Sequence, residues 1–316
     1  MDITLGIDTS PENINNIEGL IQQISRKKSC AFIGAGLSHD AGYPLFDEAV
    51  SHLKTSAEAI VGYKIDLPTD ENWDQIEYLR NLMGEANYRE EIIRIFGPDG
   101  KHDYLPVHHS ICSIPFLSLI TTNFDYCLEN AAKNIPKKVT VQYFPELDIT
   151  RLRDYHIFHI HGVIRPTNPE ELIGSIVFSN RDYEVAYQMN TGLPRFLASL
   201  SEFVTIVFIG YSLGDPDLIK VIHATQLELE RRGNIEIQAG LGKRIQPKHY
   251  IIMHQEARVN ADAIRELGLL PIRYCGDKDR HSDLQKLLSY IRRRTTEIDY
   301  YEPVINREMF EDGFYG

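Results

Sequence analysis

The feature that most constrains the fold is a short apolar run that ends in a glycine-rich turn. Residues 30–33 read Cys-Ala-Phe-Ile, and residues 34–38 read Gly-Ala-Gly-Leu-Ser. An apolar run of this length is typical of a strand that is buried on both faces in a parallel sheet. The glycines predict a tight turn, and a helix that opens near Leu37 would direct its unpaired first amides at an anion. The candidate phosphate-binding residues are Gly34, Ala35, Gly36 and Ser38.

This turn departs from the usual dinucleotide-binding fingerprint. That fingerprint has a third glycine, and His39 stands at its position in this chain. A strand-to-helix turn that binds no ligand therefore remains an alternative interpretation.

Further apolar runs alternate with helical patterns along the chain. The extended runs are 30–33, 116–121, 139–143, 155–160, 203–209, 249–253 and 272–274. Strands that alternate with helices predict a parallel sheet wound by right-handed crossovers. The predicted fold class is therefore α/β, a Rossmann-like doubly wound parallel sheet.

A block of helical patterns separates the first two predicted strands. We interpret residues of about 47–110 as a helical insertion that lies over the phosphate loop, within one domain of residues 10–295. A capping box at Ser282 and Gln285 predicts the start of the last helix. The acidic, aromatic segment 296–316 is a candidate docking segment, with disorder as the alternative.

Composition excludes several classes of function. The chain has 33 basic and 45 acidic side chains and a net charge of −12, which argues against direct nucleic-acid binding. None of the four cysteines belongs to a C-x-x-C pair, so we do not expect a zinc site made of cysteines. Isolated cysteines are typical of a protein in the reducing cytoplasm, where we expect this chain. No apolar run reaches membrane-spanning length and the first residues do not resemble a signal peptide, so we expect no membrane association.

Polar residues collect where four predicted strands end. They are residues 34–38, 123–125, 161–162 and 210–217. Since ligands bind beyond the carboxyl ends of parallel strands, these four segments predict one shared site. In it, Gly210 and Ser212 would support a ribose or a phosphate, and Asp125 would accept from a ligand amide.

Asn123 and His161 are the candidates for chemistry. An imidazole can act as a general base or orient a ribose hydroxyl, because its pKa lies near working pH. An asparagine cannot take up a proton, but it can fix a ribose or a water. Structural roles without chemistry remain as alternatives: Asn123 would form an Asx-turn, and His161 would cap a turn. The other histidines of the central region, His108, His109, His156 and His159, are interpreted as surface, packing or supporting groups rather than as metal ligands.

The four segments together resemble a known family. Gly-Ala-Gly-Leu-Ser at 34–38, Thr-Thr-Asn-Phe-Asp at 121–125, His-Gly at 161–162 and Gly-Tyr-Ser-Leu-x-Asp-Pro-Asp at 210–217 are similar, in order, to the signatures of the sirtuin superfamily. The resemblance covers residues of about 15–295 and is greater to the bacterial sirtuin-like branch than to deacetylating sirtuins. The chain lacks the sirtuin zinc module and the arginine that follows the sirtuin glycine loop, and it has Thr122 where sirtuins have glutamine.

The resemblance implies an NAD+-consuming effector of bacterial anti-phage defence. On this resemblance Asn123 and His161 are the catalytic pair, Asp125 contacts nicotinamide, and the 34–38 loop and Ser212 contact NAD. It also matches Asp217 and Ser179-x-x-Asp182-Tyr183, to which we assign structural roles.

The sequence therefore predicts an NAD+ hydrolase that needs no metal and forms ADP-ribose and nicotinamide. A defence enzyme of this kind must stay silent until triggered, so we expect a homo-oligomer or control by a partner ATPase or a phage-derived activator. One alternative is an NAD-dependent protein deacylase, whose peptide cleft the zinc module normally frames. The other is a non-catalytic sensor of NAD or ADP-ribose, against which the presence of Asn123 and His161 argues.

Overall fold

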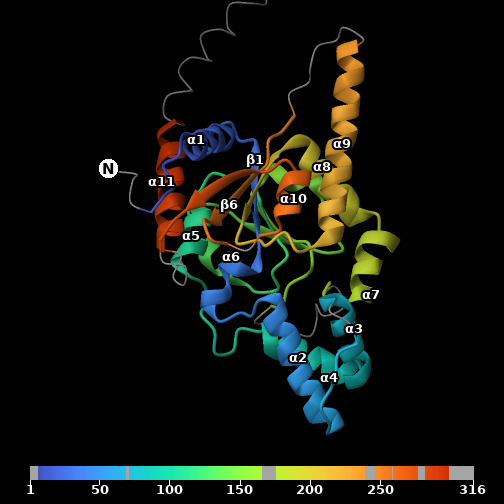
Figure 1. The fold of residues 1–316 in the computed structure, drawn as a ribbon. Coiled ribbons are helices and arrows are strands. Elements are labelled where there is room, and N and C mark those ends of the chain that lie inside the picture. The colour runs from blue at the N-terminus through green and yellow to red at the C-terminus, as the bar shows by residue number, and fades with distance from the viewer. Residues whose placement is uncertain are drawn as a thin grey trace, which may run out of the picture.

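The computed structural model describes residues 6–68, 71–165, 176–238, 246–257, 259–276 and 282–298. Within these ranges the centre is a seven-stranded sheet in the order β3-β4-β2-β1-β5-β6-β7, and every pair of neighbours is parallel (Figure 1). The strands are β1 (Ser29–Ile33), β2 (Leu119–Thr121), β3 (Thr140–Tyr143), β4 (His156–His159), β5 (Thr205–Ile209), β6 (Tyr250–His254) and β7 (Leu270–Tyr274). The predicted α/β class with a parallel sheet is confirmed.

Strand β1 lies at the middle of the sheet and is buried over its whole length. Its side chains alternate between two cores: Ala31 and Ile33 belong to one, and Cys30 and Phe32 belong to the other. The apolar run is continuous because helices cover both faces, which leaves no position facing water. The chain leaves β1 toward β2 on one side and leaves β5 toward β6 on the other, and such a reversal opens a crevice at the carboxyl ends of the strands.

Two helical layers cover the sheet (Figure 1). One layer contains α1 (Pro11–Ser25), α5 (Pro106–Ser113), α6 (Cys127–Ala132) and α11 (Ser282–Ile298). The other contains α8 (Gly192–Phe203), α9 (Pro216–Gln238) and α10 (Ala261–Glu266). Helix α1 has a capped start, because Ser10 accepts from the amide of Asn13 and proline occupies the first turn.

A separate lobe below the sheet consists of α2 (Phe46–Val61), α3 (Asn72–Met83) and α4 (Glu85–Phe96) (Figure 1). These helices form their own apolar core, to which Phe124 and Phe178 from the body contribute. The lobe is also fixed by Arg80 of α3, whose Nη1 lies 2.9 Å from Oδ1 of Asp182 in α7 (Asn180–Tyr183). The predicted helical block exists, but α5 packs in a sheet layer and not in the lobe.

The structure corrects several local predictions. The helix expected from Leu37 is absent, and two 3₁₀ turns, η1 (Ala35–Leu37) and η2 (His39–Ala41), stand in its place. Gly42 stops them because it is left-handed, with φ of 97°, and Pro44 disfavours a helical Tyr43.

The capping box predicted for the last helix is also wrong. Helix α11 already includes Ser282, and the side chain of Gln285 donates to Oγ of Ser110 instead of reaching back. The proposed docking segment lies outside the described residues except for 296–298.

Candidate active site

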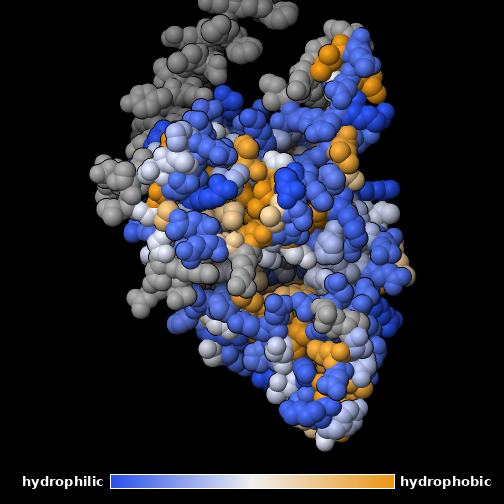
Figure 2. Space-filling model, viewed as in Figure 1, coloured by the Kyte–Doolittle hydropathy of each residue, from blue (hydrophilic) through white to orange (hydrophobic). Residues whose placement is uncertain are grey.

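A cavity of about 1,050 Å³ opens beyond the carboxyl ends of the central strands, between the sheet and the lobe. Figure 2 shows the hollow between the two parts, with apolar residues exposed along it. Of the predicted site residues, Ala35, Gly36, Ser38, Asn123, Asp125, His161, Gly210 and Ser212 line this cavity. Gly34 lies behind it, against the loop that follows β5. The structure therefore brings the four strand-end segments to one place.

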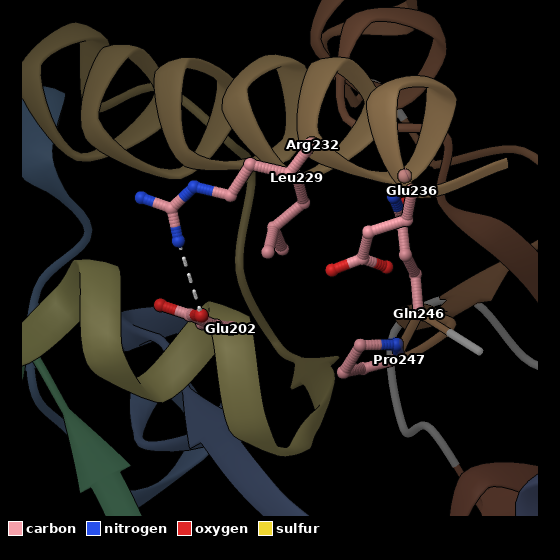
Figure 3. A pocket seen from close by; sticks show the side chains of 7 residues that line it. Glu202, Leu229, Arg232, Glu236, Gln246 and Pro247 are labelled. Atoms are coloured by element: carbon pink, nitrogen blue, oxygen red, sulfur yellow. Dashed lines mark ion pairs between the residues drawn. The ribbon is translucent and has the colours of Figure 1, made fainter. Parts of the chain in front are cut away.

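A second hollow lies between α8 and α9. It is lined by Glu202 and Arg232, whose side chains approach to 3.6 Å (Figure 3). Its volume of about 20 Å³ has room for about one water molecule. The large cavity is therefore the candidate site.

The glycine loops after β1 and β5 pack backbone against backbone. The amide of Gly34 donates to the carbonyl of Ile209, and the amide of Gly36 donates to the carbonyl of Gly210, each at 3.0 Å. A Cβ on Gly34 would lie 2.5 Å from the oxygen of Gly210, and Gly210 has a φ of 64°. Both glycines are therefore required by the contact between the loops, whatever ligand the loops hold.

The amides of the first loop are less available than the sequence predicts. Those of Gly36, Leu37 and Ser38 all donate to carbonyls of the protein, while the amide of Ala35 is not among these donors. The expectation of a row of unpaired amides is wrong, because 3₁₀ turns consume amides that the start of an α-helix would leave free.

We expect Gly34→Ala to destabilise the protein by roughly 1–3 kcal/mol, the usual cost of overpacking. The new methyl group would collide with backbone atoms of Gly210 and Tyr211, which cannot move away as a flexible side chain would. Thermal unfolding measures the effect as a fall of several degrees in Tm. Gly233→Ala is the control, since its Cβ meets only Nε2 of Gln246, at 3.9 Å, and alanine favours the helix. Equal Tm values for the two variants would contradict the packing argument.

Asn123 is held at three points and has one free acceptor. Its backbone amide donates to Oγ1 of Thr121 at 3.0 Å. Its side-chain Nδ2 donates to the backbone oxygen of Gly34 at 3.2 Å and to Oγ of Ser38 at 3.3 Å. Its Oδ1 is buried and has no hydrogen-bond partner among the described residues. An Asx-turn would use this oxygen for a local amide, so that alternative is wrong. A buried acceptor without a partner calls for a donor from water or a ligand.

Two neighbours complete this side of the cavity. Oδ1 of Asp125 accepts from the amide of Cys127 at 3.0 Å and so begins α6. His108 is buried, and its Nδ1 accepts from the amide of Leu105 at 3.0 Å, so Nε2 carries the hydrogen and points to Oγ of Ser38 at 3.3 Å. No pattern in the sequence links His108 to Ser38, because the contact depends on how α5 packs beside the first loop.

His161 lies in a buried cluster of two tyrosines and a carboxylate. Its Nε2 is 2.9 Å from the hydroxyl of Tyr187, and its Nδ1 is 3.4 Å from the hydroxyl of Tyr183. Both hydroxyls also reach Oδ2 of Asp215, at 3.1 Å from Tyr183 and 3.4 Å from Tyr187. The two tyrosine rings stack with centroids 5.4 Å apart, because α7 continues as the π-helical segment η5 (Glu184–Met189).

Burial sets the charge of this cluster. It lowers the pKa of His161 to about 3, so the imidazole is neutral at physiological pH. The expectation of a pKa near working pH is therefore wrong, and before a ligand binds this imidazole is a weak base. Burial also raises the pKa of Asp215 to about 6, although the amide of Leu218 and the hydroxyl of Tyr183 oppose the shift. His161 and Asp215 approach to 3.6 Å, but with a neutral imidazole this contact is no ion pair.

Asp215 and Tyr187 were not among the predicted site residues, and the role predicted for Tyr183 was structural. Asp215 lies in the 210–217 motif, so that motif held the signal for it. The backbone amide of Asp217, which matched the family, donates to Oδ1 of Asp215 at 3.1 Å, while its side chain pairs with Lys220 at 3.2 Å. No spacing in the sequence connects Tyr187 to His161, because the contact depends on how η5 packs over β4.

The chain is similar to one family of known proteins. Residues 117–272 match the family described as SIR2-like domain, which confirms the resemblance to the sirtuin superfamily.

Among curated proteins, the chain is 27% identical over 212 residues to "Defense-associated sirtuin 2" of Bacillus subtilis, covering 64% of this chain and 20% of that protein. It is 23% identical over 247 residues to "NAD(+) hydrolase ThsA" of Bacillus cereus (strain MSX-D12), covering 77% and 46%. The chain thus spans less than half the length of these relatives.

Among solved structures, the chain resembles a crystal structure of Sir2 in complex with an inhibitor, 2′-O-acetyl-ADP-ribose and a deacetylated peptide. The TM-score is 0.40 and the identity is 14%, over 89% of this chain and 98% of that one.

Proposed function

We propose that the chain hydrolyses NAD+ to ADP-ribose and nicotinamide. The observation that carries the proposal is that one cavity is lined by both Asn123, whose buried Oδ1 has no hydrogen-bond partner among the described residues, and His161, whose imidazole is neutral. These are an acceptor for a water or a ribose hydroxyl and an unprotonated imidazole that can orient a ribose hydroxyl or take up a proton. The relatives named NAD(+) hydrolase ThsA support the same reaction.

The proposed reaction adds water across the N-glycosidic bond. Nicotinamide leaves with the bonding electrons, the ribose passes through an oxocarbenium-like state, and water supplies the new hydroxyl and releases one proton. Oδ1 of Asn123 accepts from the water or from a ribose hydroxyl, and His161 takes up the released proton. Asp125 contacts the nicotinamide amide, while Ser212, Gly210 and the 34–38 loop hold the ribose and phosphates.

The test is to incubate the purified chain with NAD+, with and without an acetylated peptide, and to separate the products. ADP-ribose and nicotinamide without the peptide support the hydrolase. O-acetyl-ADP-ribose that appears only with the peptide would support a deacylase. Binding of ADP-ribose without any turnover, under every trigger supplied, would support a sensor.

We further propose that residues 10–295 form the catalytic domain of a regulated effector in the cytoplasm that acts in anti-phage defence, as the name of the Bacillus subtilis relative suggests. A homo-oligomer, a partner ATPase or a phage-derived activator would hold it silent or trigger it. Helix α9 supports a contact surface, because it exposes the apolar side chains of Leu227 and Ile235 (Figure 2). In the described part of the chain, no helix is both long and apolar enough to cross a membrane. The assembled mass in solution tests the oligomer.

We expect the pH profile of kcat/KM to fall on the acidic side with a midpoint near pH 6. Below that pH, Asp215 becomes protonated and accepts less well from the tyrosine hydroxyls that hold His161. The side chain in Asp215→Asn cannot titrate, so this variant should lose the acidic limb of the profile. Its kcat should be lower by roughly 10- to 100-fold, the range known for groups that orient a metal-bound histidine.

The control for this profile is Asp217→Asn, which changes a partly exposed carboxylate two residues away. It should keep the acidic limb, with a lower midpoint because the charge of Asp217 helps to raise the pKa of Asp215. An unchanged limb in Asp215→Asn would contradict the assignment.

Because the pKa of Asp215 is raised in the folded chain, its protonation favours folding as pH falls from about 6 toward 3.8, and Asp215 does not cause acid unfolding in that range.

A further inference from the structure

A buried histidine and glutamate lie directly beneath the loop that carries Asn123. His159 is the last residue of β4 and is 1% exposed, and Glu129 lies in α6 and is 5% exposed. The Nδ1 atom of His159 is 2.9 Å from the backbone oxygen of Asn123, and its Nε2 atom pairs with Oε1 of Glu129. Neither residue lines the cavity, so neither can touch a ligand there.

The direction of these hydrogen bonds follows from the chemistry of the partners. A carbonyl oxygen only accepts, so Nδ1 of His159 must carry a hydrogen and donate it to Asn123. Burial opposes a charge on His159, but the nearby Glu129 carboxylate outweighs burial and raises its pKa. The imidazolium can therefore donate from both nitrogens, to Asn123 and to Glu129.

The backbone of Asn123 is thus clamped on both sides. Its amide donates to Oγ1 of Thr121, which itself donates to the oxygen of Ile33, and its carbonyl accepts from His159. The register supports this clamp, since His159 pairs with Thr121 across β4 and β2. Because the side chain is attached to this backbone, the position of Oδ1 depends on both contacts.

We propose that Glu129 and His159 are positioning residues that hold Asn123 for NAD+ hydrolysis. The inference rests on the function proposed above. Glu129 orients the ring of His159, and His159 holds the carbonyl of Asn123, so the pair acts on turnover and not on ligand binding.

The decisive variant is Glu129→Leu/His159→Phe. A single substitution at His159 would leave the buried charge of Glu129 without a partner. Replacing both residues avoids this. We expect kcat to fall by about 10- to 100-fold, because a misplaced catalytic group loses about this much. KM for NAD+ and the Kd for ADP-ribose should stay within about twofold, since the cavity lining is unchanged.

Two further variants separate positioning from loss of structure. In Glu129→Gln, the new amide can donate to Nε2 of a neutral His159, whose Nδ1 hydrogen still reaches Asn123, so kcat should recover to within about threefold of wild type. His156→Phe is the matched control. It replaces another buried histidine of β4, and the ring of His156 stacks on Phe158 and not on Asn123. It should leave kcat unchanged.

A readout independent of activity is ¹⁵N NMR of the histidine rings. The wild type should show a protonated Nδ1 for His159, assigned by its loss in the double variant. Wild-type kcat in the double variant, a joint loss of kcat and ADP-ribose affinity, or an unprotonated Nδ1 would each overturn the proposal. If the wild type does not consume NAD+, the proposed function fails, and the NMR signal still decides whether His159 donates to Asn123.

Discussion

Asn123→Ala is expected to lower the kcat of NAD+ hydrolysis by about 100- to 1,000-fold, the usual effect of removing one positioned group that stabilises the transition state. The substitution removes a side-chain acceptor that is buried and has no hydrogen-bond partner among the described residues, in a residue that lines the cavity. It also removes the donor to the oxygen of Gly34 and to Ser38. The measurement is the initial rate of nicotinamide release at saturating NAD+.

The control for Asn123→Ala is Asn81→Ala, which truncates an exposed asparagine of α3 whose amide reaches only Glu77. It should keep wild-type turnover. Because the 34–38 loop and Ser212 remain, Asn123→Ala should still bind ADP-ribose, which separates lost chemistry from lost binding. Turnover within threefold of wild type would remove Asn123 from the catalytic pair.

His161→Phe is the second large expected effect, a fall of about 100- to 10,000-fold in kcat, as for the loss of a general acid or base. Phenylalanine keeps a ring between Tyr183 and Tyr187 but offers no nitrogen to a hydroxyl. The control is His223→Phe on α9, a half-buried histidine away from the cavity. Wild-type turnover in His161→Phe would remove His161 from the catalytic pair, and another base would have to take up the proton.

The same variant has a second consequence, for stability against acid. The pKa of His161 is about 3 in the folded chain and ordinarily 6.5, so the unfolded chain takes up this proton first as pH falls below 6.5. His161 therefore costs stability between pH 6.5 and about 3. The difference in Tm between pH 7.5 and pH 5 should be smaller in His161→Phe than in the wild type.

Which structural predictions succeeded depends on how local their causes are. Strand β1 and helix α1 follow from runs and caps that neighbouring residues complete. The helix predicted at Leu37 failed because Gly42 and the loop after β5 decide how that turn closes, and Gly210 of this loop is 174 residues beyond its partner Gly36. The predicted capping box at Ser282 failed for a similar reason, since Gln285 finds Ser110 in another helix.

The candidate site shows the same division. Asn123, Asp125 and His161 could be predicted because polar residues at the ends of buried strands stand out in an otherwise apolar context. Asp215, Tyr187, Glu129 and His108 could not be placed, since their roles depend on contacts between different elements.

The order of strands, helices and polar strand ends is determined by the amino-acid sequence itself, because periodicity and turn chemistry act over a few residues. Only the tertiary structure decided the state of each group. Burial makes His161 neutral and raises the pKa of Asp215, and packing leaves Oδ1 of Asn123 without a partner. Desolvation and hydrogen bonding depend on which atoms surround a group in space, and those atoms come from elements far apart in the chain.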